Sequence, residues 1–288
     1  MALISEMLAG GATYSFEFFP PKNDAEQVTL VRTLRELEPL APSFVSVTYR
    51  GGRESRQRTH DLVAGMLRTT TLTPMAHLVC VAHTRLELAE ILVQFRKAGV
   101  ENLMALGGDP PTDPEAGSGE LLHAVELVNL AREIGGFSIG VAAHPAGHPA
   151  SPDVQSDRDL LAVKLRLADF AVTQFFFEAE EYVGLVADLA ARGVHKPVLP
   201  GIMPVTALRS VPRMAQMGAA LPAWAVDRLE EASARGGDDA VRQAGVAMAT
   251  ELCEKLLEAG APGLHFYTLN RSSATREIYA ALGLSTNA

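Results

Sequence analysis

Cysteine is scarce in this chain, and long uncharged apolar runs are missing. Only Cys80 and Cys253 occur among 288 residues, both inside apolar segments, which favours buried thiols in a reducing compartment over a disulfide framework. No uncharged apolar run reaches the ~18 to 20 residues of a membrane-spanning helix. The N-terminal segment lacks a basic region and carries Glu6 within its short apolar stretch, which argues against a signal peptide. We therefore expect a cytoplasmic protein with no membrane segment.

Positive charge is also in deficit. The chain has 25 Lys and Arg against 34 Asp and Glu, a formal net charge of -9. Because nucleic acids and anionic membranes are bound by clustered cations, this balance predicts neither as a partner. The 48% of hydrophobic and 20% of charged residues are ordinary for a globular protein. We expect small-molecule partners, and a homo-oligomer is compatible with the sequence.

What is present is a regular alternation of strand-like and helical segments. Eight segments rich in β-branched or aromatic residues begin at Tyr14, Phe44, Ala76, Asn102, Ser138, Phe170, Pro197 and Gly263. Amphipathic segments between them include 24–37, 84–98, 179–192 and 239–259, and the stretch 206–239 has room for two helices. Connections of this length imply parallel strands. The pattern predicts an α/β fold, a (β/α)8 TIM barrel, as a single domain over residues 1–288.

One carboxylate interrupts the first strand-like segment, YSFEFF at 14–19. Strand alternation places Glu17 on the face opposite Phe16 and Phe18. A solvent-facing residue on an edge strand is the alternative, but a closed barrel has no edge strand. In the next strand, Ser46 and Thr48 share a face and are expected to point inward. Barrel enzymes place their chemistry at the C-terminal ends of the strands, so Glu17 is a candidate for the site.

Seven motifs follow one another at the strand ends: FEFFPPK, FVSVTY, ALGGDPP, VAAHPAGHP, TQFFF, LPGIMPV and HFYTLNR. Together they resemble the flavoprotein methylenetetrahydrofolate reductases, and the resemblance covers about residues 16–284. It implies reduction of 5,10-methylenetetrahydrofolate to 5-methyltetrahydrofolate by NADH or NADPH through bound FAD, in the service of methionine synthesis. No GxGxxG follows a strand, so neither nucleotide is expected to bind in the Rossmann manner.

The resemblance assigns roles to two acidic residues. Glu17 matches the family's catalytic acid, which protonates the folate, and burial would favour the protonated form that such an acid needs. Asp109 matches a catalytic aspartate beside the flavin and the pterin. Taken alone, an aspartate before Pro-Pro is more typical of a turn.

Cofactor and substrate residues also follow from the resemblance. Those implied for FAD or the nicotinamide are Thr48, Tyr49, His77, Gly108, Asp109, His123, Ala124, His144, His148, Asp157 and Lys164. Those implied for folate are Glu17, Gln174, Ser210, Met214, Leu269 and Arg271. Lys164 would pair with the diphosphate and Arg271 with the glutamate tail of folate. Without the resemblance, His77 would be interpreted as a core histidine and Lys164 as a solvated helical lysine.

Some positions depart from the family pattern. Gly107 stands where arginine is expected and His144 where tyrosine is expected, and Ser210 and Met214 replace glutamine and phenylalanine. His144 and His148 are four residues apart, but prolines make this segment an irregular loop, and we predict no metal site there. Two alternatives stay open: a relative without flavin that passes hydride directly to folate, and a non-catalytic folate- or flavin-binding partner in a methyl-transfer assembly.

Overall fold

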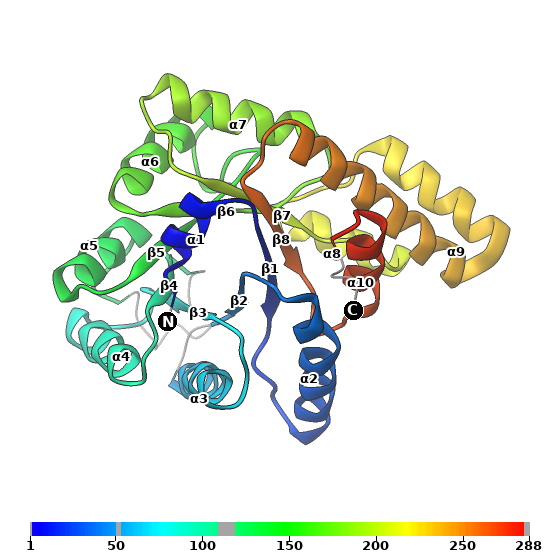
Figure 1. Cartoon of the computed structure of the whole chain (residues 1–288). Coiled ribbons are helices and arrows are strands. Elements are labelled where there is room, and N and C mark those ends of the chain that lie inside the picture. Colours follow the sequence, from blue (N-terminus) through cyan, green and yellow to red (C-terminus); the bar gives the residue numbers. More distant parts are fainter. Residues whose placement is uncertain (1, 50–52, 109–118, 285–288) are drawn as a thin grey trace.

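A closed barrel of eight parallel strands forms the body of the molecule. The computed structural model describes residues 2–49, 53–108 and 119–284. Neighbouring strands are hydrogen-bonded in chain order from β1 to β8, and β8 pairs with β1 to close the sheet. Helices surround the strands (Figure 1). The predicted (β/α)8 barrel is confirmed.

The elements alternate along the chain as the sequence indicates. The strands are β1 Thr13–Phe18, β2 Phe44–Val47, β3 Pro74–Val79, β4 Asn102–Leu106, β5 Ser138–Ala143, β6 Phe170–Phe175, β7 Val198–Ile202 and β8 Gly263–Tyr267. The helices are α1 Ile4–Gly10, α2 Asp24–Leu37, α3 Arg53–Thr69, α4 Arg85–Lys97, α5 Ala124–Ile134, α6 Val154–Leu167, α7 Ala179–Ala191, α8 Val211–Gln216, α9 Ala223–Glu258 and α10 Ser273–Ala281. The described residues also include the short 3-10 helices η1 Glu38–Leu40 and η3 Leu208–Ser210. Among the described residues, no helix combines the length and the apolar character needed to cross a bilayer.

Helix α4 shows how local sequence sets the ends of an element. The side chain of Thr84 accepts a hydrogen bond from the amide of Glu87, and the Glu87 carboxylate accepts one from the amide of Thr84, which completes a capping box. Gly99 follows the helix with φ of 84°, a conformation that glycine adopts without strain. The predicted helix is confirmed together with its caps.

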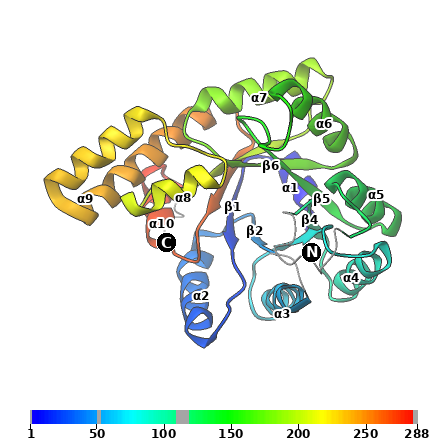
Figure 2. The ribbon, with the colours of Figure 1, turned by 180° about the vertical axis from the view of Figure 1, so that it is seen from behind.

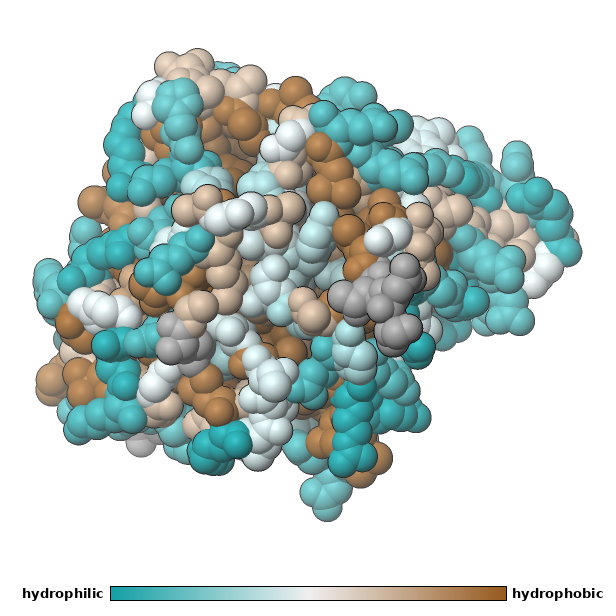
Figure 3. All heavy atoms as spheres, viewed as in Figure 1, coloured by the Kyte–Doolittle hydropathy of each residue, from teal (hydrophilic) through white to brown (hydrophobic). Residues whose placement is uncertain are grey.

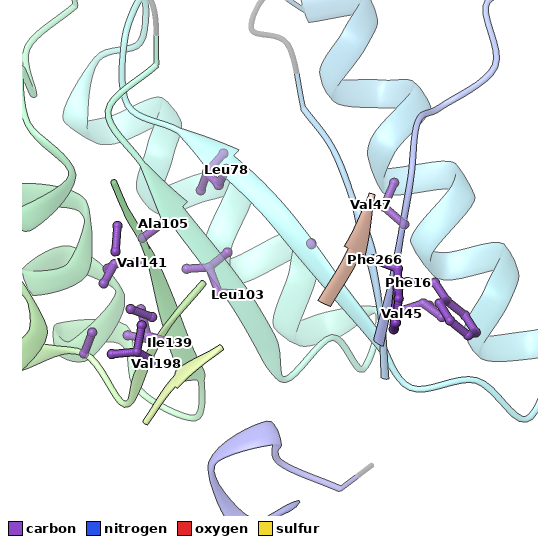
Figure 4. Packing of buried hydrophobic residues seen from close by; sticks show 14 of the residues in the cluster. Phe16, Val45, Val47, Leu78, Leu103, Ala105, Ile139, Val141, Val198 and Phe266 are labelled. Carbon is purple, nitrogen blue, oxygen red and sulfur yellow. The ribbon is translucent and has the colours of Figure 1, made fainter. Parts of the chain in front are cut away.

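The outward face of the barrel packs against the helices. Phe16 of β1 and Phe266 of β8 lie side by side on this face (Figure 4), with ring centroids 6.2 Å apart and no exposure to solvent. Burying a phenylalanine stabilises the fold by roughly 1.5 to 3 kcal/mol, and Phe18 is buried on the same face. Because successive strand residues point to opposite sides, the outward aromatic residues direct Glu17 into the barrel.

The inward face is apolar near the N-terminal ends of the strands, and α1 closes that end. Ile4 and Leu8 lie one helical turn apart and are both buried. They form one apolar cluster with Phe44, Met75, Met104, Phe170, Val172 and Leu199. The amide of Ile4 donates to Oδ1 of Asn102 at 2.9 Å, so a barrel side chain satisfies a helix end that lacks its own capping residue. Figure 1 shows α1 lying across the barrel.

Helix α9 is a hairpin of two helical segments. Non-helical angles at Gly236 and Gly237 break it, at the turn predicted between two helices. Arg228 and Glu251 from the two segments form an ion pair with an N to O distance of 2.7 Å, which shows that the segments run antiparallel. The hairpin projects beside the barrel in both ribbon views (Figures 1 and 2), and hydrophilic residues cover much of its far end (Figure 3). At Gly245 a Cβ atom would overlap the carbonyl of Val205, so the hairpin approaches the exit of β7 closely.

Candidate active site

The carboxyl group of Glu17 lies inside the barrel, and its residue is 6% exposed. Ser46 of β2 donates from Oγ to Glu17 Oε2 at 3.4 Å. The Nε2 atoms of His77 from β3 and His265 from β8 lie 3.6 and 3.5 Å from the same oxygen. The inward orientation predicted for Glu17 and Ser46 is confirmed. A buried carboxyl group thus stands among three polar side chains from three other strands.

His265 was not selected from the sequence. It is fully buried, its Nδ1 lies 2.8 Å from Ser15 Oγ, and its ring stacks on Phe44 with centroids 6.2 Å apart. Alternation in the segment GLHFYTL places this histidine opposite the outward Phe266, and that pattern could have identified it. His265 therefore links the polar cluster at the mouth to the apolar layer below it.

Tyr267 was missed as well, although it shares the inward face of β8 with His265. Its hydroxyl donates to the carbonyl of Thr173 at 2.7 Å and so joins β8 to β6. Burial, reinforced by the charge of Glu17, raises the pKa of Tyr267 well above its usual value. The phenol is therefore a hydrogen-bond donor rather than a base at neutral pH.

His77 is held in its neutral form. Burial lowers its pKa to about 4, although the charge of Glu17 acts in the opposite direction. Its Nε2 atom has no hydrogen-bond partner in the part of the chain that the structure describes. A neutral, unpartnered imidazole beside a carboxyl group is suited to contact a bound ligand.

Acid is expected to destabilise the fold through two histidines. Burial also lowers the pKa of His144 to about 4, with the charge of His148 acting in the same direction. The unfolded chain, in which histidine titrates near 6.5, then binds more protons than the native chain between about pH 6.5 and 4. Stability is therefore lost as the pH falls through this window, by up to about 1.4 kcal/mol per pH unit for each histidine.

Urea unfolding at a series of pH values measures this loss. His77→Gln should remove part of the slope, whereas the same change at the exposed His195 should leave the slope as in the parent protein. A free energy of unfolding that stays constant from about pH 7.5 to 5 would contradict the assignment.

Thr48 and Tyr49 follow β2, as predicted for residues at the mouth. Thr48 Oγ1 is buried and has no hydrogen-bond partner among the described residues. The hydroxyl of Tyr49 lies 2.9 Å from Nε2 of His83, while Nδ1 of His83 lies 2.8 Å from the carbonyl of Val81 and must donate to it. Tyr49 is therefore the donor in its bond to His83, and burial raises its pKa to about 12. His83 was missed because its partner is distant in sequence.

The exit of β4 is built from glycine. Gly108 has φ of 88°, and a Cβ atom there would overlap a neighbouring valine. Among the described residues, a Cβ atom at Gly107 would meet only the amide nitrogen of Ala124, at 3.9 Å. Helix α5 begins at Ala124, with His123 in the capping position. Asp109 lies outside the described residues, so its predicted role stays a prediction.

The loop between β5 and α6 brings His144 and His148 into contact, with ring centroids 4.6 Å apart. Lys164 lies on α6 beside this loop. Its ammonium group donates to the carbonyl of Ala142 at 2.7 Å, and burial lowers its pKa to about 8. The cation predicted to hold a diphosphate is thus already bonded within the chain.

Arg158 anchors the same loop and was not selected from the sequence. It is 2% exposed and donates to the carbonyls of His144, at 2.9 Å, and Pro145. It also pairs with Asp157 at 3.1 Å and with Asp188 at 3.3 Å. Asp157, expected at the cofactor, is therefore the partner of a buried arginine.

The predicted folate residues lie around the exits of three strands. Gln174 is the penultimate residue of β6, Ser210 and Met214 lie at α8, and Leu269 and Arg271 follow β8. The amide of Gln174 donates to the carbonyl of Met217 at 3.4 Å, which joins β6 to the end of α8. Met214 is 3% exposed and packs in an apolar cluster under α8, whereas Leu269 and Arg271 are exposed.

The polar and ionisable side chains gather at the C-terminal ends of the strands, where (β/α)8 enzymes bind and transform their ligands. The barrel with its buried carboxyl group defines an enzyme of the (β/α)8 class. The chain belongs to the methylenetetrahydrofolate reductase family, whose model matches residues 3–283.

Curated relatives agree along almost the full chain. Proteins described as 5,10-methylenetetrahydrofolate reductase are 34% identical over 281 residues in Escherichia coli and 35% identical over 280 residues in Salmonella typhimurium. Each alignment covers 96% of this chain and 92% of the relative. A Clostridium thermocellum structure, described as an uncharacterized protein that binds two copies of 5-methyl-5,6,7,8-tetrahydrofolic acid, superposes with a TM-score of 0.67 over 99% of this chain and 98% of its own. At 14% identity, that structure supports the fold alone.

Proposed function

We propose that this chain reduces 5,10-methylenetetrahydrofolate to 5-methyltetrahydrofolate, with NADH or NADPH as electron donor, bound FAD as carrier and Glu17 as general acid. The observation that supports it best is the Glu17 carboxyl group, buried at the barrel mouth among Ser46, His77 and His265. Family membership and the names of the bacterial relatives indicate the substrate.

In the proposed reaction, Glu17 would donate a proton to the folate. Opening the five-membered ring of the folate requires protonation of a nitrogen, and an ionised carboxylate cannot supply that proton. The Glu17 residue is 6% exposed, and its carboxyl group lies beside the neutral His77. The hydroxyl of Ser46 and the two imidazoles limit the directions open to the carboxyl group. We infer that Glu17 presents its proton toward the mouth.

The residues present fit the ring end of FAD. A flavin accepts hydride from a nicotinamide and passes it to a second substrate. The hydroxyl of Thr48 and Nε2 of His77 are buried polar atoms without partners among the described residues, which suits hydrogen bonding to a polar ring. At Gly107 a Cβ atom would meet only the amide nitrogen of Ala124 among the described residues, which leaves room there for a planar group to approach the backbone.

The diphosphate end of FAD fits less directly, and the second candidate is direct hydride transfer to folate from NADH or another carrier, without flavin. The ammonium group of Lys164 already uses one of its three donors on the carbonyl of Ala142, which leaves two for a diphosphate. Asp157 is likewise committed to Arg158. His144 and His148 contact each other beside these groups. Their proposed contacts with the cofactor would be made in addition to this contact.

An absorption spectrum of the purified protein decides between the two candidates. We expect flavin bands that bleach with NADH and return on addition of 5,10-methylenetetrahydrofolate, with 5-methyltetrahydrofolate as product. A colourless protein that still forms this product would establish the direct route. A protein that binds folate or flavin without turnover would instead support a non-catalytic binding partner.

The cofactor assignment has a matched test on α6. If Lys164 turns to the diphosphate, Lys164→Ala should weaken FAD binding by roughly 10-fold or more, since a charge-assisted hydrogen bond contributes about 1.5 to 3 kcal/mol. Arg166→Ala on the same helix removes an exposed cation that bonds to a backbone carbonyl and should leave FAD affinity unchanged. Equal affinities in both variants would contradict a diphosphate contact of Lys164.

The folate subsite and the cellular setting complete the proposal. Gln174 and Arg271 would bind the pterin side and the glutamate tail, and Ser210, Met214 and Leu269 would line the path between them. Both cysteines are free and buried, which is consistent with a cytoplasmic enzyme that supplies methyl groups for methionine synthesis.

A further inference from the structure

The turn after β8 has an unusual backbone. The amide of Arg271 donates to the carbonyl of Thr268 at 2.9 Å, so residues 268–271 form a tight turn. Its two central residues, Leu269 and Asn270, have φ of 51° and 57°. Asparagine tolerates this left-handed region, whereas leucine is rarely found there. Something outside the turn must therefore hold it in place.

The side chain of Asn270 holds the turn through two hydrogen bonds to the backbone of Phe19, the residue after β1, and this pair of bonds is the grip of Asn270 on Phe19. Its Oδ1 accepts a hydrogen bond from the amide of Phe19 at 2.8 Å, and its Nδ2 donates to the carbonyl of the same residue at 2.9 Å. The carboxamide thus binds both polar groups of one residue, which a side chain with only acceptors cannot do. Ladder pairing between β1 and β8 ends at Glu17 and Tyr267, so this grip extends the contact of the two segments beyond the sheet.

A further hydrogen bond ties the same turn to the backbone of Glu17. Thr268 Oγ1 donates to the carbonyl of Glu17 at 2.6 Å and accepts a hydrogen bond from the amide of Asn270 at 3.2 Å. On the other side of the turn, Thr33 of α2 donates to the carbonyl of Asn270 at 2.9 Å. The backbone of β1 is therefore tied to one turn at Glu17 and again two residues later.

The turn also carries two of the residues proposed to bind folate. Leu269 precedes Asn270 and is 51% exposed, and the exposed Arg271 follows it. If the grip on Phe19 is lost, the left-handed turn loses an anchor, and both rim residues can shift relative to Glu17. The carboxamide of Asn270 thus sets the position of Glu17 relative to Leu269 and Arg271.

We propose that Asn270 is a positioning residue that fixes Glu17 relative to Leu269 and Arg271 by gripping the backbone of Phe19. This inference rests on the proposed function for its kinetic consequence. The grip itself can be tested without any turnover.

Three substitutions separate the grip from the backbone angle. Asn270→Ala removes both bonds and strains a residue with positive φ, whereas Asn270→Gly removes the bonds and keeps the angle accessible. Asn270→Asp keeps the acceptor for the Phe19 amide but sets a carboxylate oxygen against the Phe19 carbonyl. Asn102→Ala is the matched control, because this buried asparagine also bonds to two backbone groups, at the opposite end of the barrel.

We expect Asn270→Gly and Asn270→Ala to lower kcat for 5,10-methylenetetrahydrofolate by roughly 10- to 100-fold, the size of effect that a small misplacement of a catalytic group produces. Asn102→Ala should lower stability and leave kcat unchanged. Combining Asn270→Gly with Glu17→Gln should cost no more than Glu17→Gln alone, because Asn270 acts through that acid. A merely structural role would give multiplicative losses.

Hydrogen exchange at the Phe19 amide tests the grip directly. Exchange should accelerate at least 10-fold in Asn270→Gly and stay at the parent rate in Asn102→Ala, since only the former loses the acceptor of that amide. Unchanged exchange, or unchanged kcat in spite of faster exchange, would overturn the inference. A parent protein without reductase turnover would instead count against the proposed function, while the exchange result would still report on the grip.

Discussion

Glu17→Gln is expected to lower the turnover of 5,10-methylenetetrahydrofolate by about 10² to 10⁴-fold, the usual contribution of a positioned general acid. Glutamine keeps the shape of the side chain and a hydrogen-bonding amide, but it has no proton that it can give to the folate. The neighbours of the carboxyl group should accept the change, because Ser46 Oγ can still donate to an amide oxygen. The loss should therefore fall on chemistry rather than on folding.

Steady-state kinetics with the folate, together with reduction of the bound flavin by NADH in a stopped-flow instrument, measure this separation. Flavin reduction should stay close to the parent rate because no proton for the folate is needed in that step. Glu6→Gln makes the same chemical change at an exposed position on α1, at the other end of the barrel, and serves as the control. A Glu17→Gln enzyme that turns over folate at the parent rate would remove the acid from the mechanism.

Arg158→Ala is expected to lower the free energy of unfolding by about 3 to 5 kcal/mol, because it leaves buried partners without their counter-charge. Asp157 would remain buried beside an empty site, and the carbonyls of His144 and Pro145 would lose their donor. Since the same arginine anchors the β5–α6 loop, FAD affinity should fall together with stability. Arg158→Lys should restore only a small part of the lost stability, because an ammonium group lacks the planar set of donors with which a guanidinium group binds these partners.

Chemical denaturation and FAD titration of the same preparations test this expectation. Arg228→Ala is a matched control, since that arginine makes two short hydrogen bonds to Glu251 on the exposed hairpin and should cost no more than about 1 kcal/mol. Equal losses in the two arginine variants would show that burial of Arg158 has no special weight.

The order of the elements could be predicted from the sequence because strand and helix periodicities are local properties. The inward direction of Glu17 followed from the same source, since Phe16 and Phe18 mark the opposite face of β1. Helix α1 was not predicted. It has only seven residues and no capping side chain, and its burial depends on barrel residues more than 90 positions away, such as Asn102.

Contacts between distant segments account for the other residues that were missed. His265 reaches Glu17 only because β8 pairs with β1, and neither segment contains a sign of that register. Arg158 reads as an ordinary surface residue of an amphipathic helix until the loop before it folds over its guanidinium group. The cofactor role of Lys164 stays a prediction, and the carbonyl of Ala142 that binds its ammonium group has no signature in the sequence.

Helix α1 closes the barrel at the N-terminal ends of its strands. With Ile4 and Leu8 wedged among the lowest inward side chains, nothing as large as a nucleotide or a folate can pass through from below. In the proposed reaction, the nicotinamide and the folate would then both reach Glu17 from the C-terminal side of the barrel, where only one of them could bind at a time. Binding would then alternate between the two reactants. An excess of either one should slow turnover, because it would block the binding of the other.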